Sequence, residues 1–485
     1  MILAATLVTV RLFWLHSPAT VRINNVEYRA DRPLTKTLTG PLQLEAAGSP
    51  RIAVEGPLDV AARDGRLVLT LHMPLEEYAA GVLAGESSIF KSDEALKAMA
   101  VAARTYAVRH RGRHRAEGFD FCDTTHCQDL RLSARSDRLR AAVDSTEAEL
   151  LWYEGAPADT LYSRHCGGTT ERGDAPYLRQ QSDTFCVAVG RAEWHCELRQ
   201  QELGGPVSIL SRTASGRVAE VRAGGRRISA TDFQLSVGRA LGWDTIRSNF
   251  YDLVDRGDRV LFQGYGSGHG IGLCQIGAEQ RGLAGHNYHQ ILAFYYPGTT
   301  PGVGAQGFHW TRMDGERVEA YSTHPHEDRD ALAAADRAVR EAESRSSIQI
   351  GVRPRLRIYP TVAAFRDATG EPGYIAASTI GRTVRIQPVA TLRAAARLDA
   401  TLLHEMLHVA VEGEANPRTP QWFREGLVLY LAGTPLPPGN GAGAEQDLRR
   451  EYQSAAARVR ALVERNGRAT VMQWLRTGNA ALTPQ

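Results

Sequence analysis

The chain has 485 residues, of which 43% are apolar and 23% charged, and its formal net charge is +3. One hydrophobic core seldom serves so long a chain, so we expect two or three domains of ordinary globular composition. The small net charge gives no support for a nucleic-acid or membrane-surface protein, and no apolar run is long enough for a transmembrane helix.

Residues 8–72 alternate apolar and polar side chains in short runs, with Gly, Pro and Asp between the runs. This pattern predicts β-hairpins. The apolar start, MILAATLVTVRLFWL, has neither a basic n-region nor a small-residue cleavage site. We therefore interpret it as the first strand rather than as a signal peptide.

Two helices are predicted after these strands. Residues 73–86, reading MPLEEYAAGVLAGE, predict a helix opened by Pro74. Gly81 and Gly85 are costly inside a helix, so its end is expected to be closely packed or terminating. Residues 93–111 predict a second helix, with acidic residues at its start and basic residues at its end, as the helix dipole favours.

A compact group of cysteine and histidine residues follows. Cys122, His126 and Cys127 lie in FCDTTHCQ, with His114 shortly upstream. Two thiolates and two imidazoles would form a closed structural zinc site. A Cys122–Cys127 disulfide, or simply buried thiols, would account for the same residues.

The remaining chemistry of the first three hundred residues is less specific. Residues 264–282 form a glycine-rich segment that contains His269, and such a loop lets backbone approach a ligand closely. Cys166 and Cys186 could pair, but six cysteines allow 15 connectivities and the sequence does not choose among them. Cys274, inside the glycine-rich segment, is adequately explained as a small apolar residue.

A boundary between domains is expected near residue 300. Residues 297–307 are rich in Gly and Pro, and we place a linker at 303–317. A charged, Ala-rich helix at 327–345 opens the second domain. Strand-like runs follow at 356–360 and 384–389.

In the segment TLLHEMLHVAVEGEANPRTPQWFREGLVLY, the residue spacing predicts which side chains share one face of a helix. His404 and His408 are four residues apart, so a helix presents both imidazoles to one metal ion. Sixteen residues separate His408 from Glu425, which lies in a second amphipathic pattern. Zinc in such a site lowers the pKa of a water molecule, and Glu405 can take its proton. A chance HExxH on an amphipathic helix is the alternative.

This segment resembles the gluzincin metallopeptidases, specifically the small peptidase MA-like domains, over about Val318–Leu475. The resemblance implies His404, His408 and Glu425 as zinc ligands and Glu405 as the catalytic base. It makes Tyr430 a weaker candidate for steadying the oxyanion. It also implies a mainly helical domain with a small edge sheet that holds an extended peptide.

The first three hundred residues resemble the SpoIID/LytB family of peptidoglycan-acting proteins. The motifs occur in the family's order over about Val8–Thr300 and read PLEEYAAGVLAGE, ALKAMAVAARTYAV, CDTTHCQ, SRHCGGTTE and GSGHGIGLCQIGA followed by YYPGT. The resemblance implies a lytic transglycosylase that acts on glycan strands stripped of stem peptides, with Glu86 as its catalytic residue. It supports a metal at the Cys122 cluster and implies substrate contacts by His269, Gly268 and Gln275.

A single carboxylic acid is sufficient for this chemistry. Hydrolytic glycosidases generally need two carboxylates. A lytic transglycosylase can use the sugar's own 6-hydroxyl as nucleophile, so Glu86 would protonate the glycosidic oxygen and then accept the hydroxyl proton. Its pKa must be raised by burial for this role. The competing interpretation is that Glu86 only caps a neighbouring helix or pairs with an arginine.

We therefore expect an α+β protein with a β-rich SpoIID/LytB-like domain at 8–302 and a gluzincin-like domain at 318–485. The expected function is peptidoglycan remodelling, with one zinc in the second domain and a second, structural zinc in the first. Because its substrate lies outside the cytoplasm, we expect export to the periplasm or cell envelope. Two alternatives remain: a non-catalytic glycan-binding protein that stimulates a cell-wall amidase, and a degenerate zinc fold that serves as a scaffold.

Overall fold

The computed structural model describes residues 7–86, 88–134, 136–433 and 444–478. The chain divides into two compact units, Leu7–Gly307 and a unit that begins at Phe308. Each unit has its own hydrophobic core. The first six residues, where the apolar N-terminus begins, lie outside the described residues.

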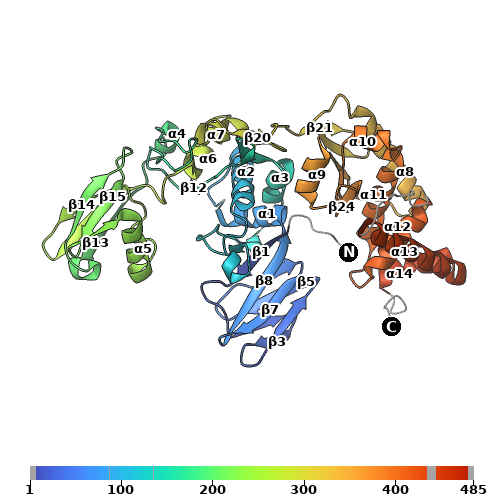
Figure 1. The fold of residues 1–485 in the computed structure, drawn as a ribbon, viewed down its shortest axis with the longest axis horizontal. Helices are drawn as coiled ribbons and strands as arrows, with labels where there is room; N and C mark the ends of the chain where they lie inside the picture. Colours follow the sequence, from blue (N-terminus) through green and yellow to red (C-terminus); the bar gives the residue numbers. More distant parts are fainter. Residues whose placement is uncertain (1–6, 87, 135, 434–443, 479–485) are drawn as a thin grey trace. The chain divides into compact units, whose positions relative to one another are not determined.

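The first unit opens with antiparallel strands, as the alternating pattern predicts (Figure 1, blue). Together with β9, which pairs parallel with β1, they form a sheet of order β4-β7-β8-β1-β9, and among themselves they form a second sheet of order β3-β2-β5-β6. In β8 every second residue is buried, so one face of the strand packs on the core. The strands are β1 Leu7–Leu12, β2 Thr20–Ile23, β3 Val26–Arg29, β4 Thr35–Leu38, β5 Pro41–Ala46, β6 Ile52–Glu55, β7 Leu58–Arg63, β8 Arg66–Pro74 and β9 Phe121–Cys122.

Two helices pack beside the first sheet and form much of the core. Helix α1 (Leu75–Glu86) begins directly after β8, so Met73 and Pro74 end the strand rather than open the helix. Helix α2 (Asp93–Arg109) begins at Ser92, whose hydroxyl accepts a hydrogen bond from the Ala95 backbone N–H. Small buried residues cover most sides of α2, which suits a helix in the middle of a core.

The rest of the first unit is built from short elements. Strands β12 and β19 pair in parallel and bring residues 162–163 beside 273–274. Between them in sequence, two three-stranded sheets, β13-β18-β17 and β14-β15-β16, enclose a separate hydrophobic core (Figure 1, green). The helices are α3 Asp137–Ser145, α4 Thr184–Val187, α5 Ala230–Leu241, α6 Gln275–Leu283 and α7 Tyr288–Tyr295. The strands are β10 Leu150–Tyr153, β11 Ala156–Pro157, β12 Tyr162–Ser163, β13 Glu193–Arg199, β14 Val207–Arg212, β15 Val218–Ala223, β16 Arg226–Ser229, β17 Tyr251–Asp255, β18 Arg259–Tyr265, β19 Leu273–Cys274 and β20 Thr300–Gly302.

The second unit combines helices with one five-stranded sheet of order β21-β22-β23-β25-β24. Strands β22, β23 and β25 are parallel, and β24 pairs antiparallel at the edge. The strands are β21 Thr311–Asp314, β22 Glu319–Ser322, β23 Arg355–Ile358, β24 Ala377–Ile380 and β25 Thr383–Ile386. The helices are α8 Arg329–Ser346, α9 Val362–Thr369, α10 Val389–Ala394, α11 Leu398–Glu414, α12 Gln421–Ala432, α13 Ala444–Asn466 and α14 Arg468–Thr477.

The protein is therefore mixed α+β. Part of the segment expected as a linker, 303–317, is ordered, because β21 pairs with β22 in the sheet of the second unit. No helix among the described residues is both long and apolar enough to cross a membrane.

Candidate functional site

Glu86 is the last residue of α1, and the two glycines before it explain how it is placed. A Cβ atom on Gly85 would lie 2.1 Å from the Asp129 carbonyl oxygen, and one on Gly81 would lie 2.6 Å from Leu130. The Arg131 backbone N–H donates to the Gly81 carbonyl at 2.9 Å. The expected close packing of this helix end is confirmed, because segment 129–131 lies directly on it.

Two neutral donors hold the Glu86 carboxylate. The Asp129 backbone N–H donates to Oε1 at 3.3 Å, and Gln275 Nε2 donates to Oε2 at 3.0 Å. Burial raises the pKa of Glu86 above its ordinary value, and the hydrogen bond from Gln275 opposes this rise. The side chain is thus suited to carry a proton at a higher pH than a solvent-exposed glutamate.

Gln275 donates to Glu86 from the start of α6, which begins directly after β19. This glutamine is the first residue of α6, and the N-cap of this helix is Cys274, whose sulfur accepts from the Gly277 backbone N–H at 3.4 Å. Gly272 has φ +71°, and a Cβ atom there would lie 2.0 Å from the Leu161 carbonyl oxygen. The glycine-rich segment therefore packs backbone against backbone beside β12.

The two other residues expected to contact substrate lie in this segment. Gly268 has φ +90°, and a Cβ atom there would lie 2.9 Å from Ser163. The His269 ring accepts from the Ile271 backbone N–H at 3.0 Å. Although the side chain is exposed, the surrounding protein atoms lower the pKa of His269 to about 4, so the ring is neutral at pH 7.

Sequence reasoning did not select Tyr162 and Gln128, which complete the surroundings of Glu86. The Tyr162 hydroxyl opposes the rise in the pKa of Glu86, and it accepts from Gln128 Nε2 at 3.0 Å. Gln128 is buried and Tyr162 is half-buried. Gln128 follows directly on the CDTTHC motif, which was a usable signal, whereas nothing in the sequence around Tyr162 distinguishes it.

His114, Cys122, His126 and Cys127 come together in the first unit, with one ligand atom of each within 4.8 Å of the others. Cys127 Sγ lies 3.3 Å from His114 Nε2, and His126 Nδ1 lies 3.8 Å from Cys122 Sγ and 3.9 Å from Cys127 Sγ. Sulfur and nitrogen ligands of one tetrahedral zinc stand about 3.6 Å apart, so the donor set fits this ion.

The contacts of these four residues also bear on the disulfide alternative. The second ring nitrogen of His114, Nδ1, is 2.5 Å from a Glu117 carboxylate oxygen, an arrangement that orients metal-bound histidines. All six cysteines of the chain are free thiols in the structure. The hydrogen bond between the two thiols lowers the pKa of Cys122 and raises the pKa of Cys127, so it favours one thiolate of the pair.

His404, His408 and Glu425 form a comparable cluster in the second unit. The two Nε2 atoms are 3.2 Å apart, and Glu425 oxygens lie 3.7 Å from His404 and 3.3 Å from His408. Nitrogen ligands of one tetrahedral zinc stand about 3.3 Å apart. Glu425 Oε1 is buried without a hydrogen-bond donor among the described residues, as a metal ligand would be. Three donors fit zinc and leave one position open.

Glu405 projects from α11 towards the edge strand rather than into this cluster. Its Oε2 accepts a hydrogen bond of 2.6 Å from Thr379 Oγ1, and Thr379 lies on β24. Burial and the negative charge of Glu405 raise the pKa of Glu371 to about 7, so a second carboxyl lies close by. Glu405 is therefore placed between the histidines and the strand expected to hold a peptide.

A tyrosine other than Tyr430 also lies near these acidic groups. Tyr430 packs against the hydrophobic core of the second unit. Burial, followed by the charges of Glu425 and Glu405, raises the pKa of Tyr452 on α13. Sequence reasoning missed Tyr452 and Glu371 because α13 and the segment after α9 reach the site only through the tertiary fold.

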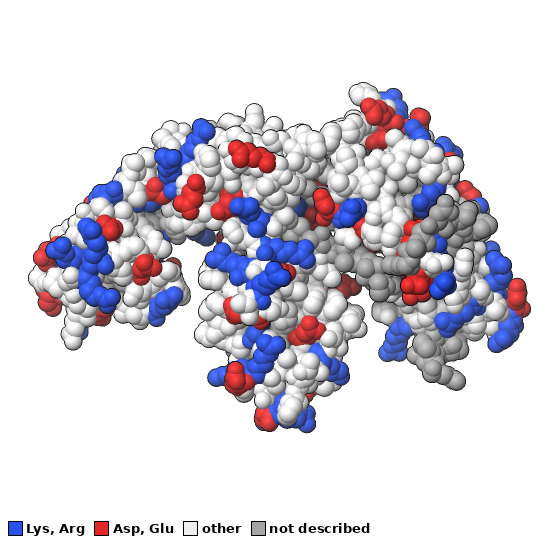
Figure 2. Space-filling model, viewed as in Figure 1, with Lys and Arg blue, Asp and Glu red and all other residues white. Residues whose placement is uncertain are grey.

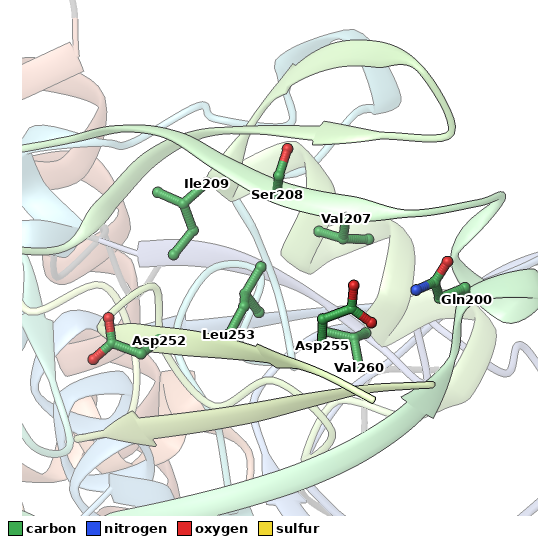
Figure 3. A pocket seen from close by; sticks show the side chains of 8 residues that line it. All are labelled: Gln200, Val207, Ser208, Ile209, Asp252, Leu253, Asp255 and Val260. Atoms are coloured by element: carbon green, nitrogen blue, oxygen red, sulfur yellow. The ribbon is translucent and has the colours of Figure 1, made fainter. Parts of the chain in front are cut away.

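Two surface hollows lie elsewhere. One of about 370 Å³ lies between β14 and the paired strands β17 and β18 (Figure 3). Its lining includes polar residues and the apolar side chains of Val207, Ile209, Leu253 and Val260. Another of about 520 Å³ is lined by residues that include Glu171 and Arg179. Neither contains the residues described above. Acidic and basic side chains are intermixed on the visible face of the molecule (Figure 2).

Comparison with known proteins bears on the first unit. Residues 63–153 match the family model described as SpoIID, Stage II sporulation protein. This part of the chain is therefore similar to the SpoIID family. The matched residues include Glu86, His114 and the Cys122–Cys127 segment, whereas the glycine-rich segment and the HEMLH helix lie outside the match.

Similar proteins agree with this assignment. The chain is 29% identical to an uncharacterized protein of Brachyspira hyodysenteriae over 253 residues, which are 48% of this chain and 67% of the relative. It is 27% identical to stage II sporulation protein D of Bacillus amyloliquefaciens over 289 residues, which are 52% of this chain and 81% of the relative. It is also 27% identical to the amidase enhancer of Bacillus subtilis over 287 residues, which are 45% of this chain and 39% of the relative.

Proposed function

We propose that this protein remodels peptidoglycan, with a lytic transglycosylase site at Glu86 and a zinc-dependent peptidase site at the HEMLH helix. The observation that carries the first half is the Glu86 carboxyl group, which is shielded enough to hold a proton and is fixed by Gln275 and the Asp129 backbone. The match of residues 63–153 to the SpoIID family and the relatives named stage II sporulation protein D and amidase enhancer support a substrate in the cell wall.

The surroundings of Glu86 suit a single group that acts first as acid and then as base. Protonated Glu86 gives its proton to the glycosidic oxygen as the bond from C1 to that oxygen breaks. The carboxylate then accepts the proton of the sugar's 6-hydroxyl as this oxygen bonds to C1, which closes a 1,6-anhydro ring. The Gln275 amide stabilises the carboxylate form between the two transfers.

The second site is proposed as a peptidase. His404, His408 and Glu425 would hold zinc, which lowers the pKa of water and polarises a carbonyl. Glu405 would accept the proton of the attacking water, and Thr379 would orient its carboxylate by donating to Oε2. The edge strand β24 offers unpaired backbone groups to an extended peptide. We propose Tyr452 beside Tyr430 as a candidate donor for the oxyanion, because the charges of Glu425 and Glu405 act on it.

His114, Cys122, His126 and Cys127 are proposed to hold a structural zinc ion. The four donors close the coordination sphere, so no position is left for substrate. Cys122 belongs to β9, which pairs with β1, so the ion would tie this motif to the main sheet. The site would then support the segment 129–131 that packs on the end of α1.

A second candidate function follows from the relative named amidase enhancer. Under this hypothesis the first unit binds glycan strands without cleaving them and stimulates a cell-wall amidase. Either function places the protein outside the cytoplasm, so we propose export to the periplasm or cell envelope.

The two functions are separated by incubating purified, peptide-free glycan strands with wild type and the Glu86→Gln variant, followed by mass spectrometry. We expect strands ending in 1,6-anhydro-muramic acid with wild type, and at least about 100-fold less product with the variant. Glu77→Gln on the same helix, where Glu77 pairs with Arg140 near the surface, is the control and should cleave normally. Intact strands bound by both wild type and the Glu86 variant would favour the amidase-enhancer reading.

A further inference from the structure

A third group of metal-binding residues lies in the first unit, outside both predicted metal sites. Cys166, Asp183, Cys186 and Cys274 are fully buried, and one ligand atom of each lies within 4.8 Å of the others. The Cys186 and Cys274 sulfurs are 3.5 Å apart. The four residues come from three distant segments: the turn after β12, helix α4 with its N-cap, and the N-cap of α6.

The number of thiols argues against a disulfide as the explanation of this cluster. A disulfide would use two of the three sulfurs and leave the third buried beside it, whereas a metal ion uses all three. The separation of 3.5 Å between two of the sulfurs is close to the roughly 3.8 Å between sulfur ligands of one tetrahedral zinc. Backbone N–H groups of Cys166 and Gly277 donate to the Cys274 sulfur at 3.3 and 3.4 Å, which stabilises a thiolate.

The charges around the cluster fit a bound divalent cation. Arg281 pairs with Asp183 at 3.2 Å, and Arg217 donates to the Cys166 carbonyl at 2.5 Å. Both arginines are buried. Three thiolates and one carboxylate carry four negative charges, and one Zn²⁺ with these two guanidinium groups balances them. Buried charges persist only when they are balanced in this way.

Besides Asp183, His165 is a candidate for the fourth ligand, because its Nδ1 lies 3.3 Å from Cys186 Sγ. The hydrogen bonds of these two side chains distinguish them. Both ring nitrogens of His165 are engaged, Nδ1 by the Gly167 backbone N–H at 3.0 Å and Nε2 by the Gly190 carbonyl at 3.0 Å. A ring nitrogen offers one lone pair, but a carboxylate oxygen offers two. Asp183 Oδ2 can therefore accept its hydrogen bond of 2.7 Å from the Tyr295 hydroxyl and still bind a metal ion.

We propose that Cys166, Cys186 and Cys274, with Asp183 as fourth ligand, form a structural zinc site that anchors the first turn of α6. Gly277 fits this arrangement, because a Cβ atom there would lie 2.1 Å from Asp183 Oδ2. Gln275 directly follows Cys274 and donates to Glu86, so the ion would fix the position of this donor. The effect on glycan cleavage rests on the proposed function, but the metal content does not.

The test measures zinc in the purified full-length protein by native mass spectrometry and elemental analysis. Cys186→Ser should contain about one zinc fewer per chain than wild type. Cys196→Ser is the matched control, because Cys196 is a half-buried thiol on β13 outside the cluster, and it should keep the wild-type content. Equal zinc in wild type and Cys186→Ser would overturn the proposal. A denatured wild-type mass that lacks two hydrogens, with a disulfide mapped among these three cysteines, would also overturn it.

A second measurement does not depend on the folding of a cysteine variant. The His404→Ala substitution removes the zinc site of the second unit. X-ray absorption at the zinc edge of this variant then reports the mean number of sulfur ligands per zinc ion. The His114 cluster supplies two sulfurs and the proposed site three. A mean above two supports the proposal, and a mean of two or fewer contradicts it, whether or not the glycan-cleaving activity is found.

Discussion

At the residue scale, the chemistry assigned to Glu86 depends on how its proton is held. Burial favours the protonated acid, while the amide of Gln275 and the Asp129 backbone N–H favour the carboxylate. The balance leaves the pKa of Glu86 raised. A general acid with a raised pKa keeps its proton towards neutral pH, where an exposed glutamate has lost it.

The pH profile of glycan cleavage tests this balance. Activity should fall as the pH rises through the pKa of Glu86, because only the protonated acid starts the reaction. Gln275→Met removes a donor that stabilises the carboxylate, so the pKa rises further and the alkaline limb of the profile moves to higher pH. Gln280→Met, on the same helix, should leave the limb in place. A limb that stays fixed in the Gln275 variant, or moves to lower pH, would contradict the assignment.

At the element scale, α1 carries Glu86 to its place because its end lies directly on segment 129–131. Gly85→Ala would place a methyl group 2.1 Å from the Asp129 carbonyl oxygen. We expect a loss of about 1–3 kcal/mol in the free energy of unfolding, and lower cleavage because the Asp129 backbone N–H is displaced from Glu86. Thermal unfolding measures the first effect.

Gly413→Ala on α11 is the control for this substitution. Open space surrounds a Cβ atom at Gly413, so alanine should be neutral or stabilise the protein by about 0.5–1 kcal/mol. If Gly85→Ala were as stable as wild type, the close packing at the end of α1 would not be needed to place Glu86.

Local patterns made several elements predictable. The alternation of residues 8–72 predicted the strands, and the spacing of HEMLH predicted a helix with two histidines on one face. The start of the α1 helix was predicted two residues early, because β8 continues through Pro74. Proline at the end of a strand and proline at the start of a helix look alike in sequence.

Contacts between distant segments could not be predicted in the same way. Tyr162, Tyr452 and the Cys166 cluster acquire their neighbours only when separate segments meet in the fold. Cys274 illustrates the limit, because its sequence context fits a small apolar residue, while the structure places its sulfur 3.5 Å from that of Cys186. The family resemblance supplies one such residue, because it points to Gln275, which donates to Glu86 in the structure.

At the scale of the whole molecule, each unit has its own core and its own proposed active site. His404→Ala should therefore lower the zinc content by about one ion per chain and leave glycan cleavage unchanged. His326→Ala, an exposed histidine of the same unit, should keep all the zinc. Unchanged zinc in His404→Ala would refute the ligand assignment, and lost glycan cleavage would show that the sites depend on each other.

The most direct test of the central claim is cleavage of peptide-free glycan strands in water enriched in oxygen-18, with the new chain ends weighed by mass spectrometry. If Glu86 uses the sugar's own 6-hydroxyl as the nucleophile, the ends are 1,6-anhydro-muramic acid without the heavy isotope, and Glu86→Gln yields none. Reducing ends that carry oxygen-18 would show hydrolysis by water, which requires a second catalytic group and would contradict the mechanism.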